Sequence, residues 1–165
     1  MKTIYSKDAS NKKMLVTREF AAPLELTWKV WTDRNSLDEW WAPKPWKTET
    51  KEMDLRKGGH WLYSMNGPDG TRHWCRCDFN DMTLLKSFST TVYFCDEAGN
   101  RNPGLPTQYW KVDFSKTASG TKVLVELTFG TEKELQTIIE MGFEQGFAMA
   151  HGNLDELLAK EMQAA

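Results

Sequence analysis

Two cysteines separated by one residue, Cys75 and Cys77, are the first candidates for chemistry in this chain of 165 residues. Alternate residues of a strand share a face, so both thiols would point the same way, as half of a zinc site or a redox pair. A zinc site needs four ligands, usually with a CxxC pair, and the chain has neither that pair nor two histidines at ligand spacing. We therefore expect no metal and no cofactor, and interpret both cysteines as small buried side chains.

The histidines, His60, His73 and His151, are the candidates for acid–base chemistry. None of them belongs to a GxSxG nucleophile elbow or to a Ser-His-Asp order. A general base at His73, or at a nearby acid, would suit a cyclase or hydrolase, whereas a hydrogen-bonded structural histidine is the simpler interpretation. Because no catalytic motif is found, we name no catalytic residue and favour a binding protein over an enzyme.

Eight tryptophans are the unusual count in the composition. Clusters of Trp line cores, pockets and interfaces, because the side chain is large and carries one donor. Trp40, Trp41 and Trp46 surround the turn that Pro43 and Pro45 impose. The cluster fits a gate at a pocket mouth and a packed corner equally well.

These residues must be positioned by a long C-terminal segment, residues 131–162, that contains no proline. Steps of three and four place its apolar residues on one helix face, and a single helix of this length would run about 45 Å. Thr131 and Glu134 form a capping box at its start. Gly142 and Gly146 indicate a bend or a close approach in its middle, where we expect room for a ligand. The stripe is Leu135, Ile138, Ile139, Phe143, Phe147, Ala150, Leu154, Leu157 and Leu158.

The chain before this segment has mostly β signals. Strands are predicted at 13–21, 48–55, 60–65, 72–80, 87–95, 108–116 and 121–129, and short helices at 24–33 and 35–41, the second capped by Asn35 or Ser36. Successive strands followed by a helix indicate an α+β fold with a curved antiparallel sheet in the order β-α-α-β6-α. We expect residues 1–12 to be a flexible arm and residues 13–162 to be a single domain.

Strand alternation predicts which side chains face the helix. Tyr63 opposite Cys75 places Trp61 against Cys77 and Met65 against His73 on one face. We expect a hydrophobic cavity between the sheet and the long helix, with Trp41 and Trp46 near its mouth. The other predicted ligand-binding residues are Trp61, Tyr63, His73, Cys75, Cys77, Phe79, Trp110, Phe143 and Phe147.

Composition limits the function classes. A net charge of −2 gives no electrostatic case for nucleic acid or an anionic membrane as partner. With 40% hydrophobic and 27% charged residues the chain is typical of a soluble globular protein. No apolar run approaches the roughly 20 residues of a membrane span, and the N-terminus lacks a signal-peptide core, so we expect a cytoplasmic protein.

Several motifs follow one another along the chain: Phe20-Ala-Ala-Pro23, Trp28, Trp31-Thr-Asp33, Trp40-Trp41, Asp54-Leu-Arg-Lys-Gly-Gly59-His-Trp61, Gly67-Pro-Asp-Gly70, Met141-Gly-Phe143-Glu-Gln-Gly146-Phe147 and Leu154-Asp-Glu-Leu-Leu158. In this order they resemble the activator of heat-shock protein 90 ATPase homologue family, of the START-like, birch-pollen-allergen-like (SRPBCC) superfamily. The resemblance covers roughly residues 13–160. The sequence departs from the family pattern in the loop with Pro103 and Pro106, and in the Cys75/Cys77 strand.

The resemblance implies a helix-grip fold, in which an antiparallel sheet wraps around a long C-terminal helix and encloses a cavity. It also implies a diverse set of functions, and fold does not settle function. Our first hypothesis is a protein that binds a hydrophobic small molecule, either a lipid or an aromatic, polyketide-like compound. The alternatives are a cyclase or hydrolase that uses the same cavity and a chaperone-associated interaction module, and a homodimer stays open.

Overall fold

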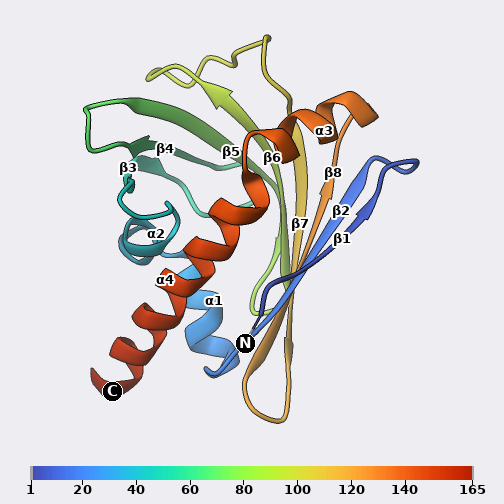
Figure 1. The fold of residues 1–165 in the computed structure, drawn as a ribbon. Helices are drawn as coiled ribbons and strands as arrows, with labels where there is room; N and C mark the ends of the chain where they lie inside the picture. Colours follow the sequence, from blue (N-terminus) through green and yellow to red (C-terminus); the bar gives the residue numbers. More distant parts are fainter. Residues whose placement is uncertain (1, 165) are drawn as a thin grey trace.

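The computed structural model describes residues 2–164, which form a single antiparallel sheet of eight strands and four helices (Figure 1). The elements are β1 (Ile4–Asp8), β2 (Lys13–Phe20), α1 (Leu24–Thr32), α2 (Arg34–Trp40), β3 (Lys47–Met53), β4 (His60–Asn66), β5 (Arg72–Thr83), β6 (Ser87–Cys95), β7 (Gln108–Lys116), β8 (Thr121–Thr128), α3 (Glu132–Glu140) and α4 (Phe143–Ala164). None of the helices in this range is both long and apolar enough to cross a membrane.

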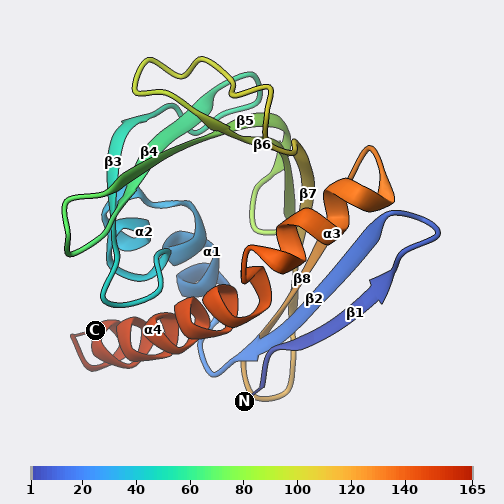
Figure 2. The same cartoon turned by 45° about the horizontal axis from the view of Figure 1, so that its top comes forward.

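The sheet curls in the order β1-β2-β8-β7-β6-β5-β4-β3, and α1, α2 and α4 lie on its inner side (Figure 2). The predicted α+β fold with a curved antiparallel sheet and a long C-terminal helix is therefore confirmed. The predicted pairing of β4 with β5 is also confirmed, because Tyr63 lies opposite Cys75 and Trp61 opposite Cys77. On the inner face of these strands, Trp61, Tyr63, Cys75, Cys77 and Phe79 are buried.

The C-terminal segment is two helices, so the prediction of one continuous helix is wrong. Thr131 caps α3 as predicted, since the Glu134 backbone N–H donates to its Oγ1 at 3.1 Å. The chain then breaks at Met141 and Gly142, and Gly142 has a φ of +87°. Glycine adopts this left-handed backbone without the steric cost of a Cβ, so the break is encoded at this residue.

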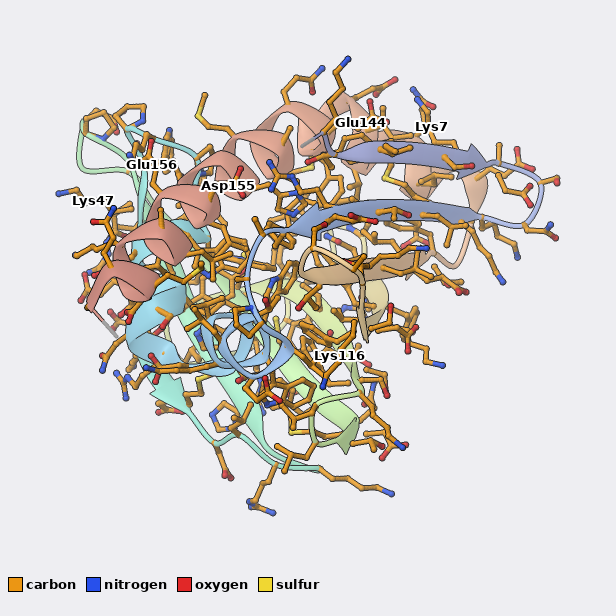
Figure 3. The ribbon with its side chains drawn as sticks, turned by 90° about the horizontal axis from the view of Figure 1, so that it is seen from below. Lys7, Lys47, Lys116, Glu144, Asp155 and Glu156 are labelled. Carbon is orange, nitrogen blue, oxygen red and sulfur yellow. The ribbon has the colours of Figure 1, made fainter. Side chains whose placement is uncertain are left out.

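Residues 4–8 form an edge strand, so the prediction of a flexible arm is wrong for this stretch. β1 pairs with β2 along its length. Tyr5 donates its hydroxyl hydrogen to the Glu144 carbonyl oxygen at 2.7 Å, and Lys7 forms an ion pair with the Glu144 carboxylate at 3.4 Å (Figure 3). The strand is exposed along most of its side chains, which explains why it lacks a hydrophobic pattern.

The cap of α2 also differs from the prediction. Asp33 caps the helix, because its Oδ2 accepts from the Ser36 backbone N–H at 3.0 Å. Asn35 and Ser36 are already inside the first turn. Asp serves as well as Asn or Ser at an N-cap, and the capping residue lies two positions before Asn35.

Gly142→Ala and Gly152→Ala should change stability in opposite directions. A Cβ at either position meets no atom within 4 Å, so neither substitution is decided by a clash. Ala at the left-handed Gly142 should cost roughly 1 to 2 kcal/mol, whereas Ala at Gly152, inside α4, should add roughly 1 kcal/mol. Urea unfolding of both variants measures this. A stabilised Gly142→Ala protein would show that the helix break does not depend on this residue.

Candidate functional site

A cavity of about 230 Å³ lies between the inner face of the sheet and the junction of α3 with α4. Its walls come from β4, β5, β6 and β7, from the residue after α2, and from both C-terminal helices. The structure brings six of the predicted residues together here: Trp41, Tyr63, Cys75, Trp110, Phe143 and Phe147. Gly142 and Gly146, from the middle of the C-terminal segment, line the same cavity.

A second void of about 30 Å³ lies deeper. Trp61, Cys77 and Phe79, also predicted to line the site, surround this inner void instead of the larger cavity. Trp41 and Trp110 border both spaces. The predicted set of residues is therefore divided between two neighbouring chambers with tryptophan side chains at their boundary.

Trp46 and His73 lie outside the lining of both chambers. The two rings stack at 5.4 Å between centroids, over the β4–β5 hairpin, and His73 is exposed. His73 shares the strand face of Cys75, but it is exposed at the start of β5 and is not among the residues that line the cavity. The geometry therefore gives no support to a base at His73.

The tryptophan cluster around the proline turn combines both predicted roles. Trp40 is fully buried and donates its indole N–H to the Val30 carbonyl oxygen at 2.8 Å, as a packed corner requires. Trp41 is half-buried and lines the cavity, where its indole N–H donates to the Tyr63 hydroxyl oxygen at 3.0 Å. Neighbouring tryptophans thus serve the core and the cavity respectively.

A chain of hydrogen bonds fixes the wall between the two chambers. Asp38 accepts from the Thr50 hydroxyl at 2.6 Å, and the Thr50 hydroxyl oxygen accepts from the Trp61 indole at 3.0 Å. The Trp61 ring then stacks on Tyr63 with centroids 4.0 Å apart. Partial burial raises the pKa of Asp38. The hydrogen bonds from Asp38 through Thr50 thus hold the Trp61 ring in place, and Trp61 in turn supports the Tyr63 ring.

Several lining residues were not predicted: Pro43, Met65, Val92, Tyr93, Phe94, Gln108, Ile138 and Met141. The sequence contains a signal for Gln108, which has the same parity along β7 as Trp110, Val112 and Phe114, and its side chain is buried. A polar residue on an otherwise apolar strand face is unusual enough to mark a site. Ile138 was predicted to be buried as an anchor of the C-terminal segment, and here it also contributes to the cavity.

The cavity is electrically neutral. Among the described residues, its lining includes no Asp, Glu, Lys, Arg or His. Burial raises the pKa of the Cys75 thiol to about 12 and that of the Tyr63 hydroxyl well above its usual value. Both groups are therefore protonated at neutral pH, and a protonated thiol is a poor nucleophile. No set of three or more His, Cys, Asp or Glu side chains in residues 2–164 is placed to hold a metal ion.

His151 lies behind the cavity wall. The side chain is 1% exposed, its ring packs 4.2 Å from the Phe147 ring, and its Nδ1 lies 2.8 Å from the Thr3 hydroxyl. Burial, with a smaller effect from the nearby Arg18 charge, lowers the His151 pKa to about 3. The imidazole is therefore neutral at pH 7 and acts as part of the core, which agrees with the structural interpretation of this histidine.

Residues 21–159 match the family model described as "Activator of Hsp90 ATPase homolog 1-like protein". The chain belongs to this family. Membership establishes the fold and leaves the function and the ligand open. A search among curated proteins gives no match.

Solved structures of bacterial proteins share this fold. A crystal structure of a protein from Mycobacterium smegmatis is 30% identical, with a TM-score of 0.88 over 96% of this chain and 97% of that one. A solution structure of a protein from Arthrobacter aurescens is 27% identical, with a TM-score of 0.89 over 95% and 91%. The AHSA1 protein from Silicibacter pomeroyi is 19% identical with a TM-score of 0.71 over 90% and 99%, and shows the shared fold alone.

His151 should make this family member less stable in acid. The unfolded histidine binds a proton near pH 6.5, whereas the folded one does so only at about pH 3. Between these values the unfolded state holds more protons, so the free energy of unfolding falls as the pH falls, by up to about 1.4 kcal/mol per pH unit from this group.

Urea unfolding from pH 7 to pH 4 measures this slope. His151→Gln should have a shallower pH dependence than the wild-type protein, and His73→Gln, at the exposed histidine, is the control for the substitution. Parallel curves for the wild-type and His151→Gln proteins would rule out His151 as the source of the acid sensitivity.

Proposed function

We propose that the protein binds a small, neutral, hydrophobic ligand with an aromatic part in the cavity between the sheet and the C-terminal helices. The observation that carries this proposal is the cavity of about 230 Å³ whose walls are almost entirely apolar. Small-molecule sites have this character, in which apolar walls supply the affinity and a few polar groups supply the orientation.

The volume indicates the size of the ligand. An apolar cavity of roughly 150 Å³ admits benzene, and ligand pockets commonly start at roughly 300 Å³. A cavity between these limits suits a compound of about two fused rings. Trp41, Trp110, Phe143 and Phe147 would surround such a compound, and ring edges and faces favour an aromatic guest in offset or edge-on contact.

The enzyme hypothesis has less support from this geometry. The ionisable side chains among the described lining residues are Tyr63, Cys75 and Tyr93, and burial raises the pKa of each. A cyclase or hydrolase would need a group that exchanges protons near neutral pH beside its substrate. The chaperone hypothesis rests on the family description alone and predicts no use for the cavity.

A size series of neutral aromatics tests the binding proposal. Toluene, naphthalene and pyrene are titrated into the protein, and the fluorescence of the lining residues Trp41 and Trp110 reports occupancy. Naphthalene should bind most tightly, because toluene leaves part of the cavity empty and pyrene requires the walls to move. The absence of a saturable change with all three compounds would refute the proposal.

Cys75→Leu should reduce naphthalene affinity by about tenfold or more, because the larger side chain occupies part of the cavity. Cys95→Leu is the matched control, since Cys95 is only partly buried and is outside the lining. Calorimetric titration compares the two variants, and their unfolding curves show whether each remains folded. Equal affinity in both would place the ligand elsewhere.

A further inference from the structure

Gln108 presents a hydrogen-bond donor to the cavity. Its side chain lies on the inner face of β7, is 6% exposed and lines the larger chamber. The Trp110 indole N–H donates to the Gln108 Oε1 at 2.9 Å. An indole nitrogen can only donate, so this bond fixes which end of the amide carries oxygen. The Nε2 group, with two hydrogens, is the other end.

The Nε2 group has no hydrogen-bond acceptor among the described residues. Protein atoms do not fully cover Nε2, so this group borders open space. Gln108 is otherwise buried and lines the larger cavity, so the open space next to Nε2 is the cavity itself. Leaving an amide N–H without a partner is costly in an apolar site, so a ligand that accepts from it gains affinity.

The Tyr63 hydroxyl, a second polar group at the cavity, is bonded within the wall. Its oxygen accepts from the Trp41 indole at 3.0 Å, and the hydroxyl is also hydrogen-bonded to the Cys75 thiol. The Tyr93 hydroxyl donates to Asp78, so Gln108 Nε2 is the polar group of this neutral, apolar lining that a ligand can engage. A ligand with a charged amine or carboxylate would lose its hydration there without an opposite charge.

We propose that the ligand is a neutral aromatic carbonyl compound, such as a two-ring ketone or lactone, whose carbonyl oxygen accepts from Gln108 Nε2. This inference rests on the proposed binding function and adds the chemical class that the site selects. Apolar walls recognise the rings, and Gln108 determines which edge of the ligand carries the oxygen. Gln108 is thus the residue that determines specificity, held in orientation by Trp110.

The first test compares 1-tetralone with tetralin, which has the same carbon skeleton without the oxygen. The side-chain amide resonances of Gln108 in a ¹⁵N-labelled protein are assigned by their loss in Gln108→Met. We expect 1-tetralone to shift these amide protons downfield at saturation, as a new acceptor should, and tetralin to leave them nearly in place. Equal shifts with both ligands, or none with 1-tetralone, would overturn the inference.

The second test measures the affinity ratio of the two ligands in each variant, which cancels the difference in their hydration. Gln108→Met should reduce the preference for 1-tetralone by about tenfold relative to the wild-type protein. Gln163→Met makes the same change at an exposed position near the end of α4 and should leave the ratio unchanged. In Gln108→Met the Trp110 indole N–H loses its acceptor and becomes available to donate to the ketone. If the affinity ratio does not change, the Gln108 amide resonances of the wild-type protein show whether Gln108 bonds the ketone, and no shift there overturns the inference.

The two proposals fail in different ways. If neither tetralin nor 1-tetralone binds, the proposed function fails. If both bind but the Gln108 amide does not respond to the ketone, the function stands and the carbonyl specificity is wrong. Protonated 1-aminotetralin, with a similar skeleton, should bind at least tenfold more weakly than 1-tetralone, and equal binding of the amine would contradict a neutral site whose available polar group is a donor.

Discussion

The contact of Phe147 with the aromatic side chains around it is the interaction on which the architecture depends. Its ring meets Trp41 at 5.8 Å, Trp110 at 5.6 Å and His151 at 4.2 Å between centroids. These partners come from the turn after α2, from the sheet and from the next turn of α4. A single buried side chain thus joins the helix, the sheet and the short helices, and sets how closely α4 approaches the inner face.

That approach also explains the hollow. Aromatic rings that meet edge to face keep their centroids apart and leave gaps that aliphatic chains would fill. The lining near Phe147 also includes small residues: Gly142 between α3 and α4, Gly146 on α4, and Cys75 on the sheet. The left-handed backbone at Gly142 then turns α3 away from the axis of α4. The combination of bulky rings and small residues in the lining leaves a cavity where α3 meets α4.

The polar groups follow the same division between inside and outside. Ion pairs such as Arg18 with Asp155, and Lys7 with Glu144, tie β2 and β1 to α4 near the surface. Inside, Tyr63 and Gln108 at the cavity are neutral, and each accepts a hydrogen bond from a tryptophan indole. The interior of the protein therefore recognises ligands by shape and a few hydrogen bonds, because any charge there would lose its hydration.

Local patterns in the sequence determined the elements and the pairing of β4 with β5, because strand alternation and helical spacing depend on near neighbours. They could not locate β1, which is held by backbone pairing and by Tyr5 rather than by an apolar face. The break at Gly142 was signalled only as a bend, because glycine permits a left-handed turn without requiring one.

The site divides in the same way. The sequence by itself determined that Tyr63, Cys75 and Trp110 would face inward, because alternate residues of a strand share a face, and it placed Trp41 near the cavity mouth. Only the tertiary structure decided which inward residues border the larger cavity, which border the inner void, and that Trp46 lies elsewhere. The physical reason is that a cavity is the volume that the packed side chains do not fill. It depends on how far helix and sheet approach each other, a distance that no local spacing encodes.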